Sequence, residues 1–225
     1  MTPRLGRVPN PETPRAMMAY PVRGHPAYRT STRFSRYYWQ MGAWLDQGDT
    51  GTCVGNALAH RYADSPNPEP GITQDWAREL YVAASGDATL QNGTSALAAC
   101  RVLASRGEIA SYHWVSSAAE LRNALLVLGS VCVGTDWFTS MFHPVKRYSG
   151  WYMDIDESSG LEGGHEYVLN GINLRPAAGP AFYRLKNSWG RGWGYNGTAR
   201  VECAALEALI FGRGGDAVLL SEVPA

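Results

Sequence analysis

The order of hydrophobic patterns along the chain limits the folds it can adopt. Apolar residues at helical spacing predict helices over 53–63, after the N-cap Thr73, over 95–106 and over 118–128. After Gly129 the pattern changes to short β-rich runs that are separated by Gly, Pro and Asn turns. These runs are SVCVGTDW, HEYVLNGIN, AFYRLKNSW, TARVEC and DAVLLSEV. Because the helices precede the strands rather than alternate with them, the chain is predicted to be α+β and not a βαβ sheet.

The length of 225 residues suits one compact domain or two lobes that share a core region. The 20 basic and 20 acidic side chains give a formal net charge of zero, so charge provides no case for a nucleic-acid partner. No apolar run is long enough to span a bilayer, and the N-terminus lacks the apolar segment of a signal peptide. We therefore expect no membrane partner and a cytoplasmic location, or a virion-associated one if a phage encodes the chain.

Residues 1–33 are rich in proline and arginine and show neither a helical nor a strand period. This pattern predicts an extended arm that packs on the body of the protein or on a protein partner. A partly disordered tail would explain the same composition.

The four cysteines lie at positions 53, 100, 132 and 203. Cys100 lies in a helix-like run and Cys132 in a β-like run, so both are predicted to be buried thiols that pack as small hydrophobic groups. An even count would allow two disulfides, but nothing marks the chain as secreted. Neither a CxxC pair nor a Cys/His spacing suggests zinc, and we expect no metal and no other cofactor.

Cys53 follows the Gly-rich turn QGDTGT and begins a predicted helix. The positive end of a helix dipole lowers the pKa of a thiol, and a thiolate beside a polar loop is a candidate nucleophile. A single cysteine at a helix start is more often structural than catalytic, so the assignment depends on partner residues.

Two further segments supply such partners. His165 follows Gly163 and Gly164 at the edge of a predicted strand, and a histidine is the usual base for a cysteine because its pKa lies near neutrality. Asn187 can accept a hydrogen bond from the far imidazole nitrogen, and Trp189 can shield that bond from water. A structural histidine and a Gly-rich turn with core aromatics would explain each segment alone.

Together, these segments resemble the papain-like (C1) cysteine peptidases. KNSWGRGWGYNG resembles the asparagine motif of that family, GGHEYVLNGIN resembles its histidine motif, and QGDTGTC resembles its nucleophile motif. The last of these includes Gln47, six residues before Cys53, as the oxyanion-hole glutamine. The order Cys, His, Asn is also the family's order. QNGTSALAACRVLASRG resembles the segment whose Asn-Gly wall lines the substrate cleft.

The resemblance implies an α+β papain-like fold, with a mainly helical left lobe over 34–128, a β-barrel-like right lobe over 129–225, and a cleft between them. It implies a thiolate that attacks a peptide or protein substrate, an oxyanion held by the Cys53 N–H and Gln47, and an acyl-enzyme that water resolves. The implied catalytic residues are Cys53, His165, Asn187 and Gln47. The implied substrate-binding residues are Asn92, Gly93, Gly164 and Trp189.

The chain also departs from the family pattern. Thr50 stands where the family has a disulfide cysteine, and the partner cysteine near Asn92 is missing too, which fits a reducing compartment. Val54 replaces the aromatic residue that usually follows the nucleophile. Glu166 stands where the residue after the histidine is often small, and we expect its carboxylate to face away from the imidazole because side chains alternate along a strand.

The 46 residues before Gln47 are too short for a propeptide of family length and lack its helical period. Three explanations stay open: the enzyme has no zymogen stage, the arm itself covers the cleft, or the fold serves assembly. The leading function is a cysteine peptidase or a related acyl-transfer enzyme. The alternative is a papain-like module with a structural role in a larger, bacterial or phage, complex.

The loop 154–164 carries four carboxylates. It only partly matches a calcium loop, so we interpret it as a solvated cleft rim. Because it directly precedes His165, we expect Asp154 and Asp156 to favour basic substrates.

Overall fold

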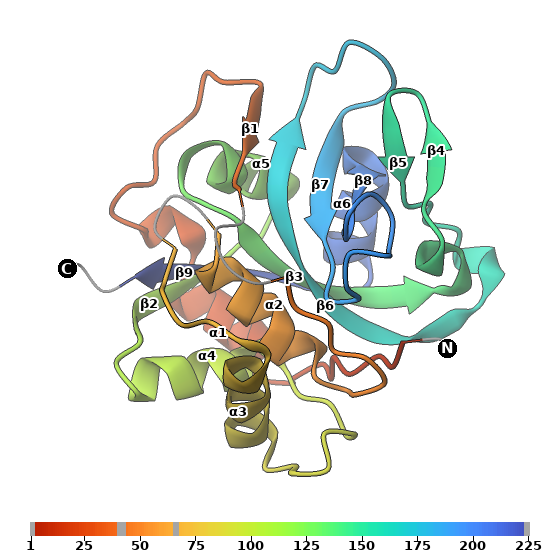
Figure 1. Cartoon of the computed structure of the whole chain (residues 1–225). Coiled ribbons are helices and arrows are strands. Elements are labelled where there is room, and N and C mark those ends of the chain that lie inside the picture. Colours follow the sequence, from red (N-terminus) through yellow and green to blue (C-terminus); the bar gives the residue numbers. More distant parts are fainter. Residues whose placement is uncertain (1–2, 40–43, 65–67, 223–225) are drawn as a thin grey trace.

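The computed structural model describes residues 3–39, 44–64 and 68–222 (Figure 1). Its α-helices are α1 (Thr13–Ala19), α2 (Cys53–Tyr62), α3 (Gln74–Ser85), α4 (Ala96–Ser105), α5 (Ala118–Val127) and α6 (Cys203–Gly212). Its strands are β1 (Ser35–Tyr37), β2 (Ile109–Trp114), β3 (Val131–Phe138), β4 (Val145–Arg147), β5 (Gly150–Tyr152), β6 (Leu161–Asn173), β7 (Phe182–Lys186), β8 (Thr198–Glu202) and β9 (Asp216–Glu222). Short 3-10 helices occupy Val22–Gly24, Thr139–Phe142 and Glu157–Ser159.

The predicted helices are confirmed together with their start signals. The side chains of Thr73, Ser95 and Ser117 each accept a hydrogen bond from a backbone N–H in the first turn of the helix that follows. Such caps satisfy backbone donors that a helix start leaves unpaired. Gly107 follows α4 with a positive φ of 70°, which suits the predicted end of that helix at a glycine.

All strands belong to one sheet, in the order β2-β9-β3-β6-β7-β8-β5-β4, with β1 paired to β6. The long strand β6 is central, because it pairs with β3, β7 and β1. Within the described residues, the end strands β2 and β4 do not pair, so the expected barrel is replaced by an open sheet. The reason is that β9 and β2 carry the sheet towards the helices, whereas β5 and β4 lie at the opposite end (Figure 1).

Two hydrophobic cores divide the molecule into two lobes, and the central strands contribute to both. Helices α2, α3 and α4 pack around the first core, which also takes Cys132, Val168 and Val218 from the strands. The neighbouring residues Val133, Tyr167 and Ala217 point into the second core. This division follows from the alternation of side chains along β3, β6 and β9.

The boundary between the lobes differs from the expected division at residue 128. Helix α5 contributes Leu121, Ala124 and Leu125 to the second core, together with α6 and the strands. The predicted mainly helical segment 34–128 therefore spans parts of both lobes. Periodicity identified α5 as a helix, but it does not show which of two cores a helical face meets.

The N-terminal arm lies on the body and is not wholly extended. Its helix α1 has Pro14 in the first turn, where the missing N–H costs nothing, and it packs Ala16 and Met17 on the first core. A helix of seven residues is too short to show a period in the sequence and depends on such packing. In Figure 1 the arm runs from beside β6 across the middle of the molecule to α1, which lies near α4 in the helical lobe.

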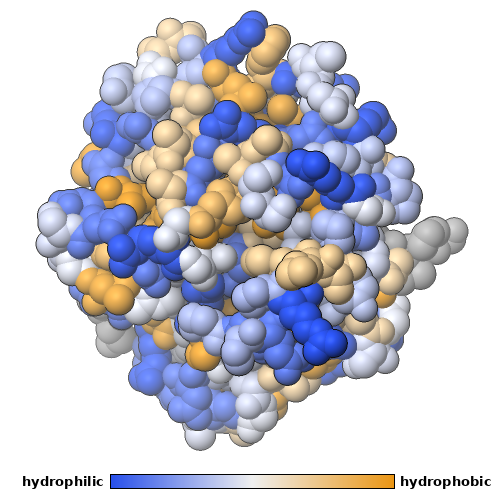
Figure 2. All heavy atoms as spheres, turned by 180° about the vertical axis from the view of Figure 1, so that it is seen from behind, coloured by the Kyte–Doolittle hydropathy of each residue, from blue (hydrophilic) through white to orange (hydrophobic). Residues whose placement is uncertain are grey.

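Cys100 and Cys132 are fully buried and unpaired, as predicted. In the described part of the chain, no helix combines the length and apolar character needed to cross a membrane. Figure 2 shows hydrophobic and hydrophilic residues interspersed over one face of the protein. Such a mixture is ordinary for the surface of a folded domain.

Candidate active site

Cys53 is the first residue of α2, as predicted, and its side chain is 0% exposed. The turn before it is fixed by Asn56, whose Nδ2 donates to the carbonyl oxygen and the hydroxyl of Thr52 at 2.9 and 3.0 Å. The thiol is therefore held at the N-terminus of a helix whose first turn is itself anchored.

His165 and Asn187 come together because β6 pairs with β7, and each residue lies beside that pairing. His165 Nε2 and Asn187 Oδ1 are 2.8 Å apart, which is the contact expected from the sequence. The Trp189 indole stacks on the imidazole at 4.8 Å between ring centroids, and Trp137 meets it edge-on at 4.7 Å. The two indoles fix the plane of the ring and keep water from the His–Asn bond.

Gln47 is held by Ser188, the residue after Asn187. Its Oε1 accepts a hydrogen bond from Ser188 Oγ at 2.6 Å, and its backbone N–H donates to the Ser188 carbonyl at 2.8 Å. Its Nε2 donates to the carbonyl oxygens of Thr50 and Arg4, both at 2.8 Å. The expected oxyanion donor thus already binds a peptide carbonyl, which comes from the arm. The role of Ser188 in orienting Gln47 was not anticipated.

The arm passes over Cys53 between three glycines that belong to the sequence motifs. A Cβ atom added to Gly6 would lie 2.0 Å from the Gly51 carbonyl oxygen. A Cβ added to Gly93 would lie 2.3 Å from the Gly6 oxygen, and one added to Gly164 would lie 2.5 Å from the Arg7 oxygen. Only glycine at positions 6, 93 and 164 leaves the width that the arm backbone needs.

Backbone hydrogen bonds hold the arm on both sides of this channel. The Arg7 N–H donates to the Gly164 carbonyl at 3.0 Å. On the opposite side, the Thr94 N–H donates to the Gly6 carbonyl at 2.9 Å, and the Val8 N–H donates to the Thr94 carbonyl at 2.8 Å. Arg7 and Thr94 form a parallel β-bridge. The arm therefore lies in the channel as an additional short strand.

The predicted substrate-binding residues divide into two groups. Gly93 and Gly164 face the arm backbone directly. Trp189 instead covers His165, and the Asn92 N–H donates to Asp87 Oδ2 at 2.8 Å. Asn92 thus helps to shape the wall through its hydrogen bond to Asp87.

Asp87 organises that wall, a role the sequence did not suggest. Its carboxylate accepts hydrogen bonds from the backbone N–H groups of Thr89, Gln91 and Asn92 and from the Tyr81 hydroxyl. The Thr89 hydroxyl also donates to Asp87, and this bond, followed by those from the backbone, holds the pKa of Asp87 well below its usual range. The loop before Gly93 is therefore fixed by one carboxylate.

Burial under the arm leaves the thiol and the imidazole uncharged. Desolvation raises the pKa of Cys53 to about 12, despite hydrogen bonds from backbone groups that act in the opposite direction. Desolvation also lowers the pKa of His165 to about 4, against the raising effect of Asn187. The expectation that the helix N-terminus lowers the Cys53 pKa is therefore wrong for this arm-covered state, because loss of water outweighs the dipole. Within the described residues, His165 Nδ1 has no hydrogen-bond partner.

A buried cluster of three charged side chains, Arg7, Asp216 and Glu166, lies next to the site. Arg7 Nη2 is 2.7 Å from Asp216 Oδ2, and Arg7 Nε is 3.9 Å from Glu166 Oε2. Glu166 therefore turns towards Arg7 rather than the imidazole, as strand alternation predicted. Asp216, at the start of β9, was not singled out from the sequence, because only strand pairing brings it near Glu166.

Three carboxylates of the acidic loop 154–164 bind neighbouring side chains of the protein. Asp154 pairs with Arg147, Glu157 pairs with Arg213 at 2.7 Å, and Glu162 accepts from the Thr139 hydroxyl at 2.6 Å. Across residues 3–39, 44–64 and 68–222, no group of His, Cys, Asp and Glu side chains could hold a metal ion. These contacts support the interpretation of the loop as a rim.

No protein-family model and no curated protein matches the chain. Solved structures do match it over most of its length. Xylellain, a cysteine protease from Xylella fastidiosa, is similar with a TM-score of 0.68 and 15% identity, covering 99% of this chain and 97% of that one. ProCathepsin B S9 from Trypanosoma congolense gives a TM-score of 0.66 and 13% identity over 98% and 87% of the two chains.

The bromelain protease from Ananas comosus, solved in complex with the E64 inhibitor, gives a TM-score of 0.65 and 16% identity over 85% of this chain and 100% of that one. Similarity at this level of identity concerns the fold. The two lobes, the helix that begins at Cys53 and the strands that carry His165 and Asn187 are thus parts of a papain-like cysteine protease fold.

Proposed function

We propose that the chain is a cysteine peptidase that hydrolyses peptide bonds through an acyl-enzyme. Cys53 is the nucleophile, His165 exchanges the proton, Asn187 orients the imidazole and Gln47 holds the oxyanion. Because His165 uses Nε2 to contact Asn187, its free Nδ1 is the nitrogen available to Cys53.

One observation carries this proposal: the site already binds a peptide segment. Gln47 Nε2 holds the Arg4 carbonyl at 2.8 Å, and the backbone of Gly6 and Arg7 lies in a glycine-lined channel above Cys53. A channel that accepts an extended backbone, with an amide donor beside a thiol, fits a peptide substrate. Amides other than peptides would not need backbone pairing on both walls.

The chemistry requires that the arm leaves first. Its departure lets water reach Cys53 and removes the desolvation that keeps the thiol protonated, so that the helix N-terminus and His165 favour the thiolate. The thiolate then attacks the substrate carbonyl, the oxyanion forms against the Cys53 N–H and Gln47, and His165 protonates the leaving amine. Water, deprotonated by His165, releases the acyl group from sulfur. We therefore propose that the arm inhibits its own active site.

The test uses the Gly6→Ala chain, in which the added methyl group cannot fit beside Gly51, so that the arm is displaced. In this background we expect Cys53→Ala and Cys53→Ser to lower the hydrolysis of a peptide library roughly thousandfold or more. Cys203→Ala, which removes a buried thiol whose charged neighbours are Glu207 and Arg122 rather than residues of the site, is the matched control and should retain hydrolysis. Turnover that survives Cys53→Ala would exclude the proposal.

The second candidate is a structural or assembly role for the papain-like module. Its support is the complete burial of Cys53 beneath an arm anchored by buried charges. If Gly6→Ala is folded, exposes Cys53 to an epoxide inhibitor and still cleaves no peptide, this second role is favoured.

A further inference from the structure

The Arg7 side chain enters a pocket that the sheet itself constructs. Gly134 on β3 pairs with Glu166 on β6 and with Asp216 on β9, so both carboxylates flank it on the same face of the sheet. A Cβ atom on Gly134 would lie 2.2 Å from Arg7 Nε and 2.4 Å from Glu166 Oε2. The absent side chain of Gly134 is therefore what makes room for a guanidinium between two acids.

The pocket contains more acceptors than Arg7 uses. Arg7 donates from Nε and Nη2 to Asp216 Oδ2, at 3.1 and 2.7 Å, and from Nη2 to the Gly214 carbonyl at 3.0 Å. Among the residues that the structure describes, neither oxygen of Glu166 has a hydrogen-bond partner, and neither does Asp216 Oδ1, although all three atoms are buried. Burial and the neighbouring Asp216 raise the pKa of Glu166, so this carboxylate gains from any cation that approaches it.

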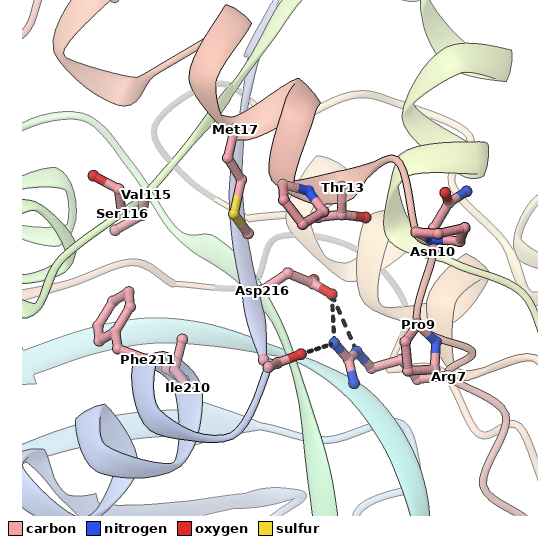
Figure 3. Close-up of a pocket in the computed structure, with 14 residues that line it drawn as sticks. Arg7, Pro9, Asn10, Thr13, Met17, Val115, Ser116, Ile210, Phe211 and Asp216 are labelled. Atoms are coloured by element: carbon pink, nitrogen blue, oxygen red, sulfur yellow. Dashed lines mark hydrogen bonds and ion pairs between the residues drawn. The ribbon is translucent and has the colours of Figure 1, made fainter.

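The pocket also borders open space. A cavity of ≈ 560 Å³ adjoins Arg7 and Asp216, between the arm with α1 on one side and α6 with the start of β9 on the other. Figure 3 shows Arg7 bonded to Asp216 there, with Met17 pointing down from α1 and Phe211 nearby on α6. Because Arg7 and Asp216 line this cavity, another side chain can reach Asp216 through it, and the space beside Glu166 becomes free when Arg7 leaves with the arm.

We propose that the pocket formed by Glu166, Asp216 and Gly134 is the subsite that selects an arginine side chain in the substrate, and that Arg7 occupies it in the resting chain as a substitute for that side chain. This inference rests on the proposed peptidase function and identifies the substrate class. The planar guanidinium suits two acids at the sides of a narrow slot, so arginine is favoured over lysine. An arginine-bearing substrate and the arm compete for one pocket.

The catalytic test measures cleavage by the Gly6→Ala chain of a peptide library in which arginine is scanned through each position among neutral residues. We expect one position at which arginine raises kcat/KM about ten- to hundredfold over citrulline, the range that a hydrogen bond to a charged group supplies. Asp216→Asn combined with Glu166→Gln should abolish that preference. The matched control is Asp154→Asn combined with Asp156→Asn on the rim loop. Asp154 is already paired with Arg147, and Asp156 accepts hydrogen bonds from Ser158, so we expect this variant to keep the preference, in contrast to the role that the sequence suggested for these two acids.

A binding test keeps the inference independent of turnover. The Cys53→Ala, Gly6→Ala chain is titrated with a fluorescent peptide of arm residues 3–9, and with the same peptide carrying citrulline in place of Arg7. We expect about tenfold or greater weakening for citrulline, and no difference between the two peptides in the Asp216→Asn, Glu166→Gln chain. Arg7→Ala is a second way to empty the pocket if Gly6→Ala does not fold.

Several outcomes overturn the inference. Cys53-dependent cleavage without an arginine preference, or a preference that survives loss of both carboxylates, removes it while leaving the peptidase function in place. A preference lost in the Asp154→Asn, Asp156→Asn chain assigns the selection to the rim loop. Equal binding of the two arm peptides also refutes it, whereas arginine-dependent binding without any cleavage supports the pocket and removes only the peptidase function.

Discussion

Two ion pairs in this protein are buried to a similar degree but join different parts of the chain. Lys186 Nζ lies 2.8 Å from Asp64 Oδ1, both side chains are 0% exposed, and both belong to the body, where they join the end of α2 to β7. Arg7 is nearly as buried beside Asp216, but it belongs to the arm. The first pair joins the C-terminal end of the helix that begins at Cys53 to the strand that precedes Asn187. The second holds a segment that, under the proposed function, has to leave the site.

The difference lies in what happens when a partner is removed. Burial lowers the pKa of Lys186 and raises that of Asp64, so each charge depends on the other and no solvent can replace it. When Arg7 leaves with the arm, the channel opens and water or a substrate cation can replace it. We therefore expect the body pair to control stability and the arm group to control access to Cys53.

The largest expected effect concerns stability. Lys186→Met leaves Asp64 buried without its cation, and we expect it to lower the free energy of unfolding by about 3–5 kcal/mol in urea denaturation. Adding Asp64→Asn should recover part of that loss, because no unpaired carboxylate remains. A loss below about 1 kcal/mol for Lys186→Met would remove the distinction between the two groups.

The second effect concerns activity. Gly6→Ala places a methyl group where the Gly51 oxygen lies 2.0 Å away, so we expect the arm to be displaced and the initial rate of peptide hydrolysis to rise at least about tenfold, which corresponds to about 1.4 kcal/mol against the covered state. Gly24→Ala is the matched control, because nothing lies within 4 Å of a Cβ there. Equal rates in the two variants would show that the arm does not limit access.

The third effect is smaller, because Arg7→Ala removes the side chain but keeps the backbone bonds of the arm. We expect a rise in initial rate that is several-fold and below that of Gly6→Ala, with little change in the urea midpoint. Arg4→Ala is the comparison, since Arg4 Nε donates to the Gln91 carbonyl at 3.2 Å in a hydrogen bond that is exposed to solvent. A large loss of stability for Arg7→Ala would contradict this prediction, because it would show that Arg7, like the Lys186–Asp64 pair, controls the stability of the fold.

The smallest expected effect is on the wall of the channel. Asp87→Asn removes the charged acceptor that holds the loop before Gly93, so we expect KM for peptides to rise a few-fold in the Gly6→Ala background while kcat changes little. The folded-state pKa of Asp87 is depressed, so its contribution to stability is present above the unfolded value of about 3.9 and is lost as the pH falls below it. The Asp87→Asn variant lacks this pH-dependent contribution, so its stability should fall less steeply in acid than that of the wild type. Its acid denaturation should therefore begin at a lower pH than its loss of stability at neutral pH, measured from the urea midpoint, would predict. A fall in kcat with unchanged KM would contradict this role.

The sequence predicted those parts of the site that are local in the chain. Short motifs with their own glycine and cap signals surround Gln47, Cys53, His165 and Asn187, so the sequence alone predicts these residues as parts of the site. The sequence does not predict Asp216 as part of the site, because Asp216 meets Glu166 only through the pairing of β9 with β3. Such a contact depends on sheet order, which periodicity does not give.

Three expectations failed for physical reasons that a pattern does not contain. The sheet is open because β2 and β9 extend it past the lobe boundary. The arm holds helix α1, which tertiary packing rather than helical period stabilises. The pKa of Cys53 is raised and not lowered, because the arm excludes water from a thiol that its position at a helix start would otherwise activate.

The central claim, that the arm rather than the intrinsic chemistry of the site keeps Cys53 unreactive, is tested most directly by the pH dependence of Cys53 alkylation, followed by mass spectrometry in the wild-type and Gly6→Ala chains. A thiol with a pKa of about 12 is protonated below that pH, so at pH 8 only about one molecule in ten thousand carries the thiolate, against about one in four at an unperturbed value of about 8.5. We expect the wild-type rate to stay very low and to rise with each pH unit through the alkaline range, and the Gly6→Ala rate to level off near or below pH 8.5. Identical profiles in the two chains, both without a plateau below pH 9, would contradict the account.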